Sequence, residues 1–101
     1  MKERVPASIA IQVLPQVPLE EIRDIVDKVI AHIDASGLTY LVGPYETTVE
    51  GDLDALLDLI KECQHICIAA GAPWMLSYIK IAYSPVEGVW SIAEKTDKYL
   101  K

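Results

Sequence analysis

The sequence has few basic residues and no cluster of them. Arg4 and Arg23 are its two arginines, and 15 acidic residues outweigh 9 basic ones to give a formal net charge of −6. Proteins that bind nucleic acids present clustered Lys and Arg to the phosphate backbone. We therefore expect no nucleic-acid partner. An acidic surface mildly favours a cationic small molecule instead.

Long apolar runs are also missing. No stretch approaches the roughly 18 consecutive apolar residues of a membrane-spanning helix. Residues 1–6 contain no apolar segment of the kind found in signal peptides. Two cysteines, Cys63 and Cys67, fit reduced thiols better than a disulfide framework. We therefore expect a cytoplasmic protein that does not associate with a membrane.

Length and composition allow one modest core. The chain has 101 residues, of which 51% are apolar. A domain of this size buries roughly two thirds of the surface of its unfolded chain. We expect a single domain over residues 1–101, with some apolar surface left for a partner.

The first half of the chain predicts a strand, a helix and two more strands. Apolar and small or polar residues alternate over residues 8–14, as in a half-buried strand that Pro15 ends. A 3.6-residue apolar period then predicts a helix that begins near Pro18, carries acidic residues in its first turn and closes at Gly37. Residues 38–42 and 47–50 favour strands on either side of the turn at Gly43 and Pro44.

The second half predicts a helix, a long strand and a short tail. Asp52 can cap a helix that Gly71 and Pro73 stop, and residues 74–83 favour a strand. The 3.6-residue period of this helix gives it an apolar stripe that consists of Leu53, Leu56, Leu57, Ile60, Cys63, Cys67 and Ile68. Ser91 and Glu94 have capping-box spacing and predict a short helix over 91–100. An alternative is that residues 89–92 first form a short strand.

The order βαββαβ predicts a fold of the α+β class. Two right-handed crossovers of this kind give a ferredoxin-like sandwich, in which an antiparallel four-stranded sheet carries both helices on one face. The other face is then free of helices. Strand alternation assigns to it residues that mix apolar, aromatic and polar side chains: Ser8, Ala10, Gln12, Leu14, Thr48, Glu50, Trp74, Leu76, Tyr78 and Lys80. We expect another subunit to cover this face by sheet-on-sheet packing.

Three segments resemble a known family. Ile11-Gln12-Val13-Leu14-Pro15 is similar to its opening strand, and residues 94–99 are similar to the ending of its short members. Residues 37–51 resemble the signature G-x-x-Y-x-x-G-P-x-x-T-x-x-E-G of the YkoF-like thiamine-binding proteins. The matching positions are Gly37, Tyr40, Gly43, Pro44, Thr47, Glu50 and Gly51.

This resemblance implies a ferredoxin-like fold, self-association as a dimer or tetramer, and binding of thiamine or its hydroxymethylpyrimidine half without catalysis. The signature brings Tyr40, Thr47 and Glu50 forward as ligand-binding candidates, and Thr48 lies within it. Strand alternation adds Gln12 and Tyr78. A carboxylate and hydroxyl groups can bond an aminopyrimidine, and an aromatic ring can stack on it or on a thiazolium cation. No further cofactor and no metal is expected.

Other interpretations of these residues remain open. Thr47 and Thr48 are good strand formers whatever the function. Glu50 can be solvated or paired with Lys80 across the sheet. Tyr78 can pack in a subunit interface instead of contacting a ligand. The whole helix-free face can instead serve an assembly or regulatory module that binds a protein partner.

Enzymatic and metal-binding alternatives fit less well. On a helix, Cys63 and Cys67 share a face and His65 lies nearly opposite, so the three cannot hold one ion, and we expect buried cysteines and an exposed histidine. The chain has no asparagine and no arginine in its first loop, both of which an acylphosphatase needs. An enzyme of thiamine salvage would need a catalytic pair that the sequence does not offer.

Overall fold

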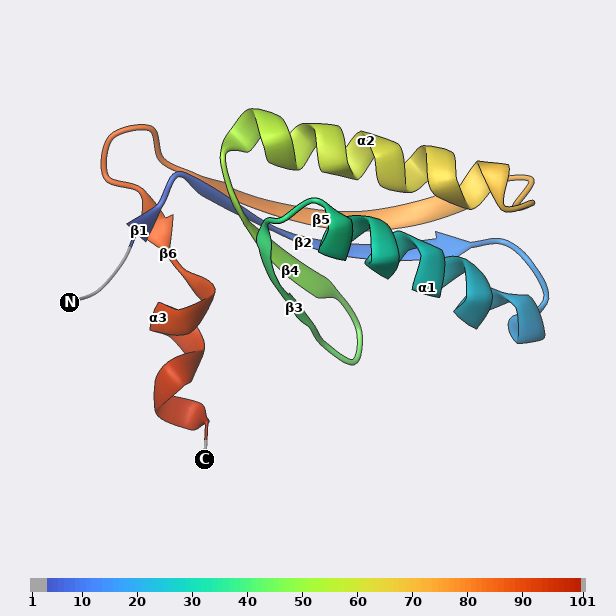
Figure 1. Cartoon of the computed structure of the whole chain (residues 1–101), viewed down its shortest axis with the longest axis horizontal. Coiled ribbons are helices and arrows are strands. Elements are labelled where there is room, and N and C mark those ends of the chain that lie inside the picture. Colours follow the sequence, from blue (N-terminus) through green and yellow to red (C-terminus); the bar gives the residue numbers. More distant parts are fainter. Residues whose placement is uncertain (1–3, 101) are drawn as a thin grey trace.

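The chain forms the predicted ferredoxin-like α+β sandwich. In the computed structural model, which describes residues 4–100, the central elements are β2 (Ala7–Pro15), α1 (Leu19–Ala35), β3 (Thr39–Val42), β4 (Thr47–Gly51), α2 (Leu53–Ala69) and β5 (Met75–Tyr83). The sheet is antiparallel with the order β3-β4-β2-β5. Both long helices lie on one side of it (Figure 1).

The core lies between the sheet and these helices. Ile9 and Ile11 of β2 and Val49 of β4 are buried beneath Ile25, Val29 and Ile33 of α1 and Leu56, Leu59, Cys63 and Cys67 of α2. The 3.6-residue period of α2 is confirmed. Leu57 and Ile68, which the sequence pattern placed in its apolar stripe, are instead exposed, and Leu59 is buried.

The ends of both helices follow the sequence signals. Pro18 is the N-cap of α1 rather than its first helical residue, so the helix begins one residue later than predicted. Asp52 caps α2 by accepting from the Ala55 N–H over 3.3 Å. Gly37 and Gly71 follow the helices with φ of 79° and 114°. A side chain is strained in that left-handed region, so glycine permits both helices to stop there.

The tail combines both predicted alternatives and adds a strand that the sequence did not reveal. β6 (Val89–Trp90) pairs with β1 (Arg4–Val5), and α3 (Ile92–Thr96) and a 3₁₀ turn (Asp97–Tyr99) follow. Ser91 accepts from the Glu94 N–H over 3.0 Å, as its spacing predicted. This C-terminal segment, residues 89–100, projects from the sheet on the side opposite α1 and α2 (Figure 1).

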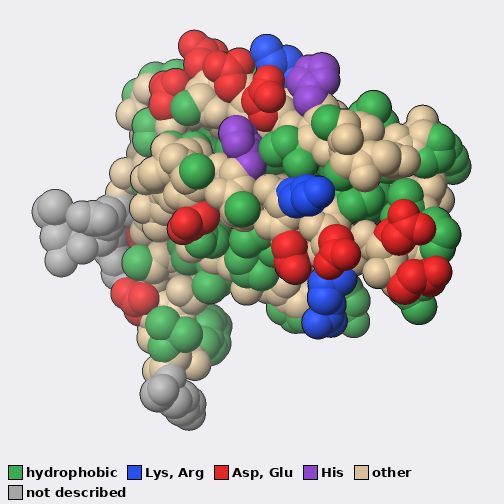
Figure 2. Space-filling view, turned by 45° about the vertical axis from the view of Figure 1, so that its right-hand side comes forward, with side chains coloured by type: hydrophobic (Ala, Val, Ile, Leu, Met, Phe, Trp, Pro, Cys, Tyr) green, Lys and Arg blue, Asp and Glu red, His purple; other side chains and the backbone are tan. Residues whose placement is uncertain are grey.

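The surface is acidic on the helix side. Asp and Glu side chains are spread over the surface that the helices form, with few Lys or Arg among them (Figure 2). Within residues 4–100, no helix combines the length and apolar character that crossing a bilayer requires.

Candidate functional site

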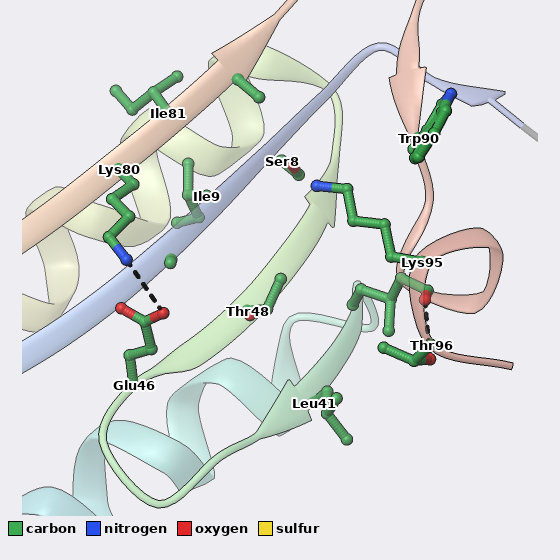
Figure 3. Close-up of a pocket in the computed structure, with 13 residues that line it drawn as sticks. Ser8, Ile9, Leu41, Glu46, Thr48, Lys80, Ile81, Trp90, Lys95 and Thr96 are labelled. Atoms are coloured by element: carbon green, nitrogen blue, oxygen red, sulfur yellow. Dashed lines mark hydrogen bonds and ion pairs between the residues drawn. The ribbon is translucent and has the colours of Figure 1, made fainter. Parts of the chain in front are cut away.

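A hollow of about 310 Å³ lies on the helix-free face, where the C-terminal segment stands over one end of the sheet. Its floor is formed by residues of β2, β4 and β5, and its wall by residues of the C-terminal segment (Figure 3). The floor side chains include Ser8, Ala10, Thr48, Lys80 and Ala82, and the wall consists of Trp90, Ile92, Lys95 and Thr96, with Leu41 and Glu46 at the rim.

The register of the strands explains why this end of the sheet is hollow. Ala10 lies between Thr48 of β4 and Lys80 of β5, and Ser8 lies between Glu50 and Ala82. Three of these floor residues have very small side chains. Small side chains on the sheet leave space between the strands and the C-terminal segment, which covers this part of the face on one side.

Glu50 holds the C-terminal wall. Its Oε1 accepts a hydrogen bond from the Ile92 N–H over 2.6 Å, across 42 residues of sequence. The Thr96 hydroxyl donates to the Ile92 carbonyl oxygen over 2.8 Å. Because a carboxylate at a backbone N–H forms a charge-assisted hydrogen bond, Glu50 fixes the start of α3 against β4.

A second contact ties the wall to the N-terminal strand. Arg4 Nε lies 3.5 Å from Glu94 Oε1, whose side chain is buried. The pair has the distance of a salt bridge but lacks hydrogen-bond geometry, so this oxygen has no hydrogen-bond partner within the described chain. The two attachments, through Glu50 and through Arg4, place the C-terminal segment over the floor.

The charges in the hollow differ from those of the chain as a whole. Lys80 Nζ pairs with Glu46 Oε2 over 3.4 Å, and the Lys95 ammonium extends over the floor toward Ser8 (Figure 3). The lining therefore contains two ammonium groups and one carboxylate, in a chain whose formal net charge is −6. The acidic net charge of the chain suggested a surface that binds cations, but the lining of the hollow is not acidic.

The six predicted ligand residues do not lie together. Thr48 is in the floor of the hollow. Gln12 and Tyr78 are cross-strand neighbours on the same face, farther along the sheet and outside the hollow. Glu50 is engaged with Ile92 rather than with Lys80, the partner considered from the sequence.

Tyr40 and Thr47 lie on the opposite, helix-covered face. They pair with Val49 and Ile11 respectively, two core residues, so strand alternation turns them toward α1. The Tyr40 hydroxyl donates to Asp34 Oδ1 over 2.8 Å, and this hydrogen bond raises the pKa of the tyrosine. Thr47 is buried and lines a smaller hollow of about 240 Å³ beneath α1. A single site that contains all six residues is incompatible with this geometry.

Sequence reasoning missed most of the wall. Alternation did assign Ser8, Ala10 and Lys80 to the helix-free face, although they were not named as ligand residues. Trp90 and Lys95 could not be found in this way, because their position depends on where a tail far along the chain docks. Trp90 is half exposed at the edge of the hollow and offers an aromatic face on which a ring can stack.

The cysteines and histidines lie away from the hollow. Cys63 and Cys67 are fully buried and His65 is exposed, as helical spacing predicted. Burial raises the pKa of the Cys63 thiol from 9.0 to about 11, so it stays protonated at neutral pH. No group of three or more His, Cys, Asp or Glu residues in the described range is arranged to hold a metal ion.

Comparisons with known proteins agree with this fold. The sequence profile of a family described as thiamine-binding protein matches residues 9–100. A UPF0045 protein of Clostridium perfringens is 41% identical over 92 residues, which is 91% of this chain and 95% of that protein.

Solved structures show the same similarity. A domain of unknown function, DUF77, of Bacillus cereus has a TM-score of 0.87 and 41% identity, covering 97% of this chain and 93% of that one. A Thermotoga maritima protein proposed to take part in thiamine biosynthesis or salvage has a TM-score of 0.84 and 31% identity, covering 93% and 98%.

Proposed function

The chain belongs to the thiamine-binding protein family, and from this premise we propose that it binds thiamine or its hydroxymethylpyrimidine half in the hollow of the helix-free face. The observation that carries the proposal is the hollow itself. Its volume of about 310 Å³ lies at the lower end of the range of roughly 300–1,000 Å³ typical of small-molecule sites. A few polar groups converge on it from an otherwise apolar lining.

The lining offers the groups that an aminopyrimidine needs. The exocyclic amine of the ring is a donor and its ring nitrogens are acceptors. The Glu46 carboxylate can accept from the amine, and the Thr48 hydroxyl can donate or accept. The Lys95 ammonium, which extends over the floor (Figure 3), can donate to a ring nitrogen. Each such hydrogen bond contributes about 1 kcal/mol net, so binding also needs the stacking surface of Trp90.

Lys80 and Lys95 influence the orientation of a bound thiamine molecule. Its thiazolium ring is cationic and is repelled by the ammonium groups of Lys80 and Lys95. We propose that the uncharged pyrimidine occupies the floor and that the thiazolium lies outward against Trp90, where a cation and an aromatic face attract each other. Hydroxymethylpyrimidine then retains most of the affinity of thiamine, because the floor recognises the shared half.

We propose binding without catalysis, in the cytoplasm. The polar groups of the lining include hydroxyls, two ammonium groups and the Glu46 carboxylate, all of which can hydrogen-bond a heterocycle, and this supports a binding role. Free, buried thiols at Cys63 and Cys67 support a reducing compartment. We also propose that the chain self-associates as a dimer or tetramer, with a second copy closing the open side of the hollow.

Calorimetric titration tests the ligand. Thiamine and hydroxymethylpyrimidine are each titrated into the purified protein, and both are expected to bind, with a melting-temperature shift that grows with ligand concentration. Ala10→Leu fills the floor and abolishes binding, and Thr48→Val weakens it roughly fivefold through one lost hydrogen bond. Thr39→Val, on the same face but outside the hollow, is the matched control. Absence of binding of both compounds at millimolar concentration would contradict the proposal.

A second candidate function is binding of a protein partner by the same sheet face. It is favoured by the exposed apolar side chains of Leu76 and Tyr78, which continue the face beyond the hollow. Tyr78→Lys separates the two functions. Under the ligand proposal this substitution leaves thiamine affinity unchanged in the isolated subunit. Under the partner proposal it abolishes capture of the partner while Ala10→Leu does not.

A further inference from the structure

A second hollow adjoins the first along the C-terminal segment. It has a volume of about 460 Å³ and is lined by Trp90, Glu94, Lys95, Lys98 and Tyr99. Trp90 and Lys95 also line the hollow on the helix-free face, so the two cavities meet at these side chains. This C-terminal hollow therefore continues the first one beyond Trp90, and a molecule bound over the sheet can extend into it.

Two ammonium groups belong to this small surface. Lys95 lies in α3, and Lys98 lies in the 3₁₀ turn that follows it. Residues three apart on a helical turn are neighbours. Lys98 Nζ lies 5.1 Å from the centroid of the Tyr99 ring, which places the ammonium group beside the aromatic lining. Two neighbouring positive charges repel each other, and an anion bound between them relieves the repulsion.

Carboxylates do not neutralise these two lysines. The lining includes Glu94, but its Oε1 lies 3.5 Å from Arg4 Nε, so the charge of this carboxylate is already offset. Within residues 4–100, neither Lys95 nor Lys98 has a carboxylate at salt-bridge distance, whereas Lys80 is paired with Glu46. The C-terminal hollow therefore keeps an excess of positive charge in a chain whose formal net charge is −6.

This combination of groups suits a phosphate ester. Phosphate oxygens accept charge-assisted hydrogen bonds from ammonium groups. A phosphate monoester carries a charge of about −1.5 to −2 at pH 7, which matches two adjacent lysines better than the single charge of a carboxylate does. The aromatic side chains of Trp90 and Tyr99 are both more than half exposed here and offer a surface for the ring system that carries the phosphate.

We propose that the C-terminal hollow is a subsite for the phosphate groups of phosphorylated thiamine, with thiamine diphosphate as the preferred ligand. The inference rests on the proposed function, which puts the pyrimidine on the floor of the first hollow and the thiazolium against Trp90. The hydroxyethyl arm of the thiazolium ring, whose hydroxyl group carries the phosphates, then extends past Trp90 toward Lys98. The phosphates also offset the repulsion between the thiazolium and the ammonium groups of Lys80 and Lys95.

Calorimetric titration with thiamine and with thiamine diphosphate tests the subsite. At low ionic strength the diphosphate is expected to bind roughly tenfold more tightly than thiamine, because exposed lysines give modest charge-assisted contacts. This preference should disappear in about 1 M NaCl, where charges are screened beyond roughly 3 Å. Lys98→Gln is expected to remove most of the preference without weakening thiamine. Lys28→Gln removes the same charge from the exposed surface of α1 and is the matched control, which retains the preference.

Inorganic pyrophosphate gives a readout that does not depend on the rings. At millimolar concentration it is expected to shift the amide NMR signals of Lys95 and Lys98 in the wild type, and not in Lys98→Gln. Equal affinities for thiamine and thiamine diphosphate, the same loss of preference in both lysine variants, or amides unmoved by pyrophosphate would overturn the subsite. Failure of the proposed function looks different: neither thiamine nor hydroxymethylpyrimidine binds, whereas pyrophosphate still shifts these amides.

Discussion

The two faces of the sheet are built for different tasks. On the helix-covered face, Ile9, Ile11 and Val49 fill the space beneath two long helices and are almost completely buried. On the other face, the neighbouring positions Ser8, Ala10 and Thr48 have small or hydroxyl side chains and line a hollow. One residue of displacement along the same strands separates a core from a candidate binding site, because successive side chains point to opposite faces.

This difference between the faces predicts what a substitution on each of them affects. Substitutions on the helix-covered face act on the free energy of unfolding, because cavities form in a close-packed interior. Substitutions on the helix-free face act on what the protein contacts. Glu50 is an exception on the helix-free face, because it holds the C-terminal wall and its substitution therefore also acts on stability.

Truncation of a core leucine is the largest test of this comparison. Leu56 is fully buried on α2, so Leu56→Ala is expected to lower the free energy of unfolding by about 3 kcal/mol. Leu76→Ala removes the same atoms from the helix-free face and is expected to cost under about 1 kcal/mol. Urea unfolding followed by circular dichroism measures both. Equal losses would mean that Leu76 is as deeply buried as Leu56, as it would be beneath a tightly bound sister subunit.

Alkaline pH is expected to give the next-largest loss of stability, and this loss arises on the helix-covered face. Burial raises the pKa of the Cys63 thiol from 9.0 to about 11 in the folded chain, so the folded state holds this proton more tightly than the unfolded state does. Its contribution is fully present below pH 9 and is lost as pH rises toward 11. The loss is at most about 3 kcal/mol for a shift of this size.

Urea unfolding at several pH values measures this loss, and Cys63→Ala provides the control. The variant lacks the thiol and should show a shallower fall in stability between pH 9 and pH 11, although its absolute stability is lower. Parallel curves for the two proteins would show that ionisation of the Cys63 thiol does not change the free energy of unfolding.

Removal of the Glu50 carboxylate tests the link between the sheet and the wall. Glu50→Ala leaves the Ile92 N–H without its acceptor and is expected to cost about 2 kcal/mol, mostly as local opening of the C-terminal segment. Hydrogen exchange of the Ile92 amide should accelerate by at least tenfold. Glu46→Gln breaks only the exposed pair with Lys80 and should leave that amide unchanged. Unaltered protection in Glu50→Ala would mean that Arg4 and packing alone hold the segment.

The sequence predicted the fold more fully than the site, for a physical reason. Alternation over 8–14 and helical periods over 19–35 are local signals, and they suffice to define which face each side chain takes. The same alternation, applied from Val49, places Thr47 with the core. The family signature specifies the spacing of residues but not the sheet face on which each one lies. It therefore included Thr47 and Tyr40 among the candidate ligand residues. Lys95 and Trp90 were beyond local reasoning, because a hydrogen bond spanning 42 residues positions the wall.

The smallest expected effect tests whether the two faces are independent. Tyr40 belongs to the family signature, yet its hydroxyl bonds Asp34 on the helix side. Tyr40→Phe removes that exposed hydrogen bond and is expected to lower the melting temperature only slightly. It should leave the affinity for thiamine or hydroxymethylpyrimidine unchanged within error, because the ring and the hollow lie on opposite sides of the sheet. Calorimetric titration beside Thr48→Val makes the comparison. If Tyr40→Phe weakened binding as strongly as Thr48→Val, the ligand would have to contact the helix side of the sheet rather than the hollow on the helix-free face.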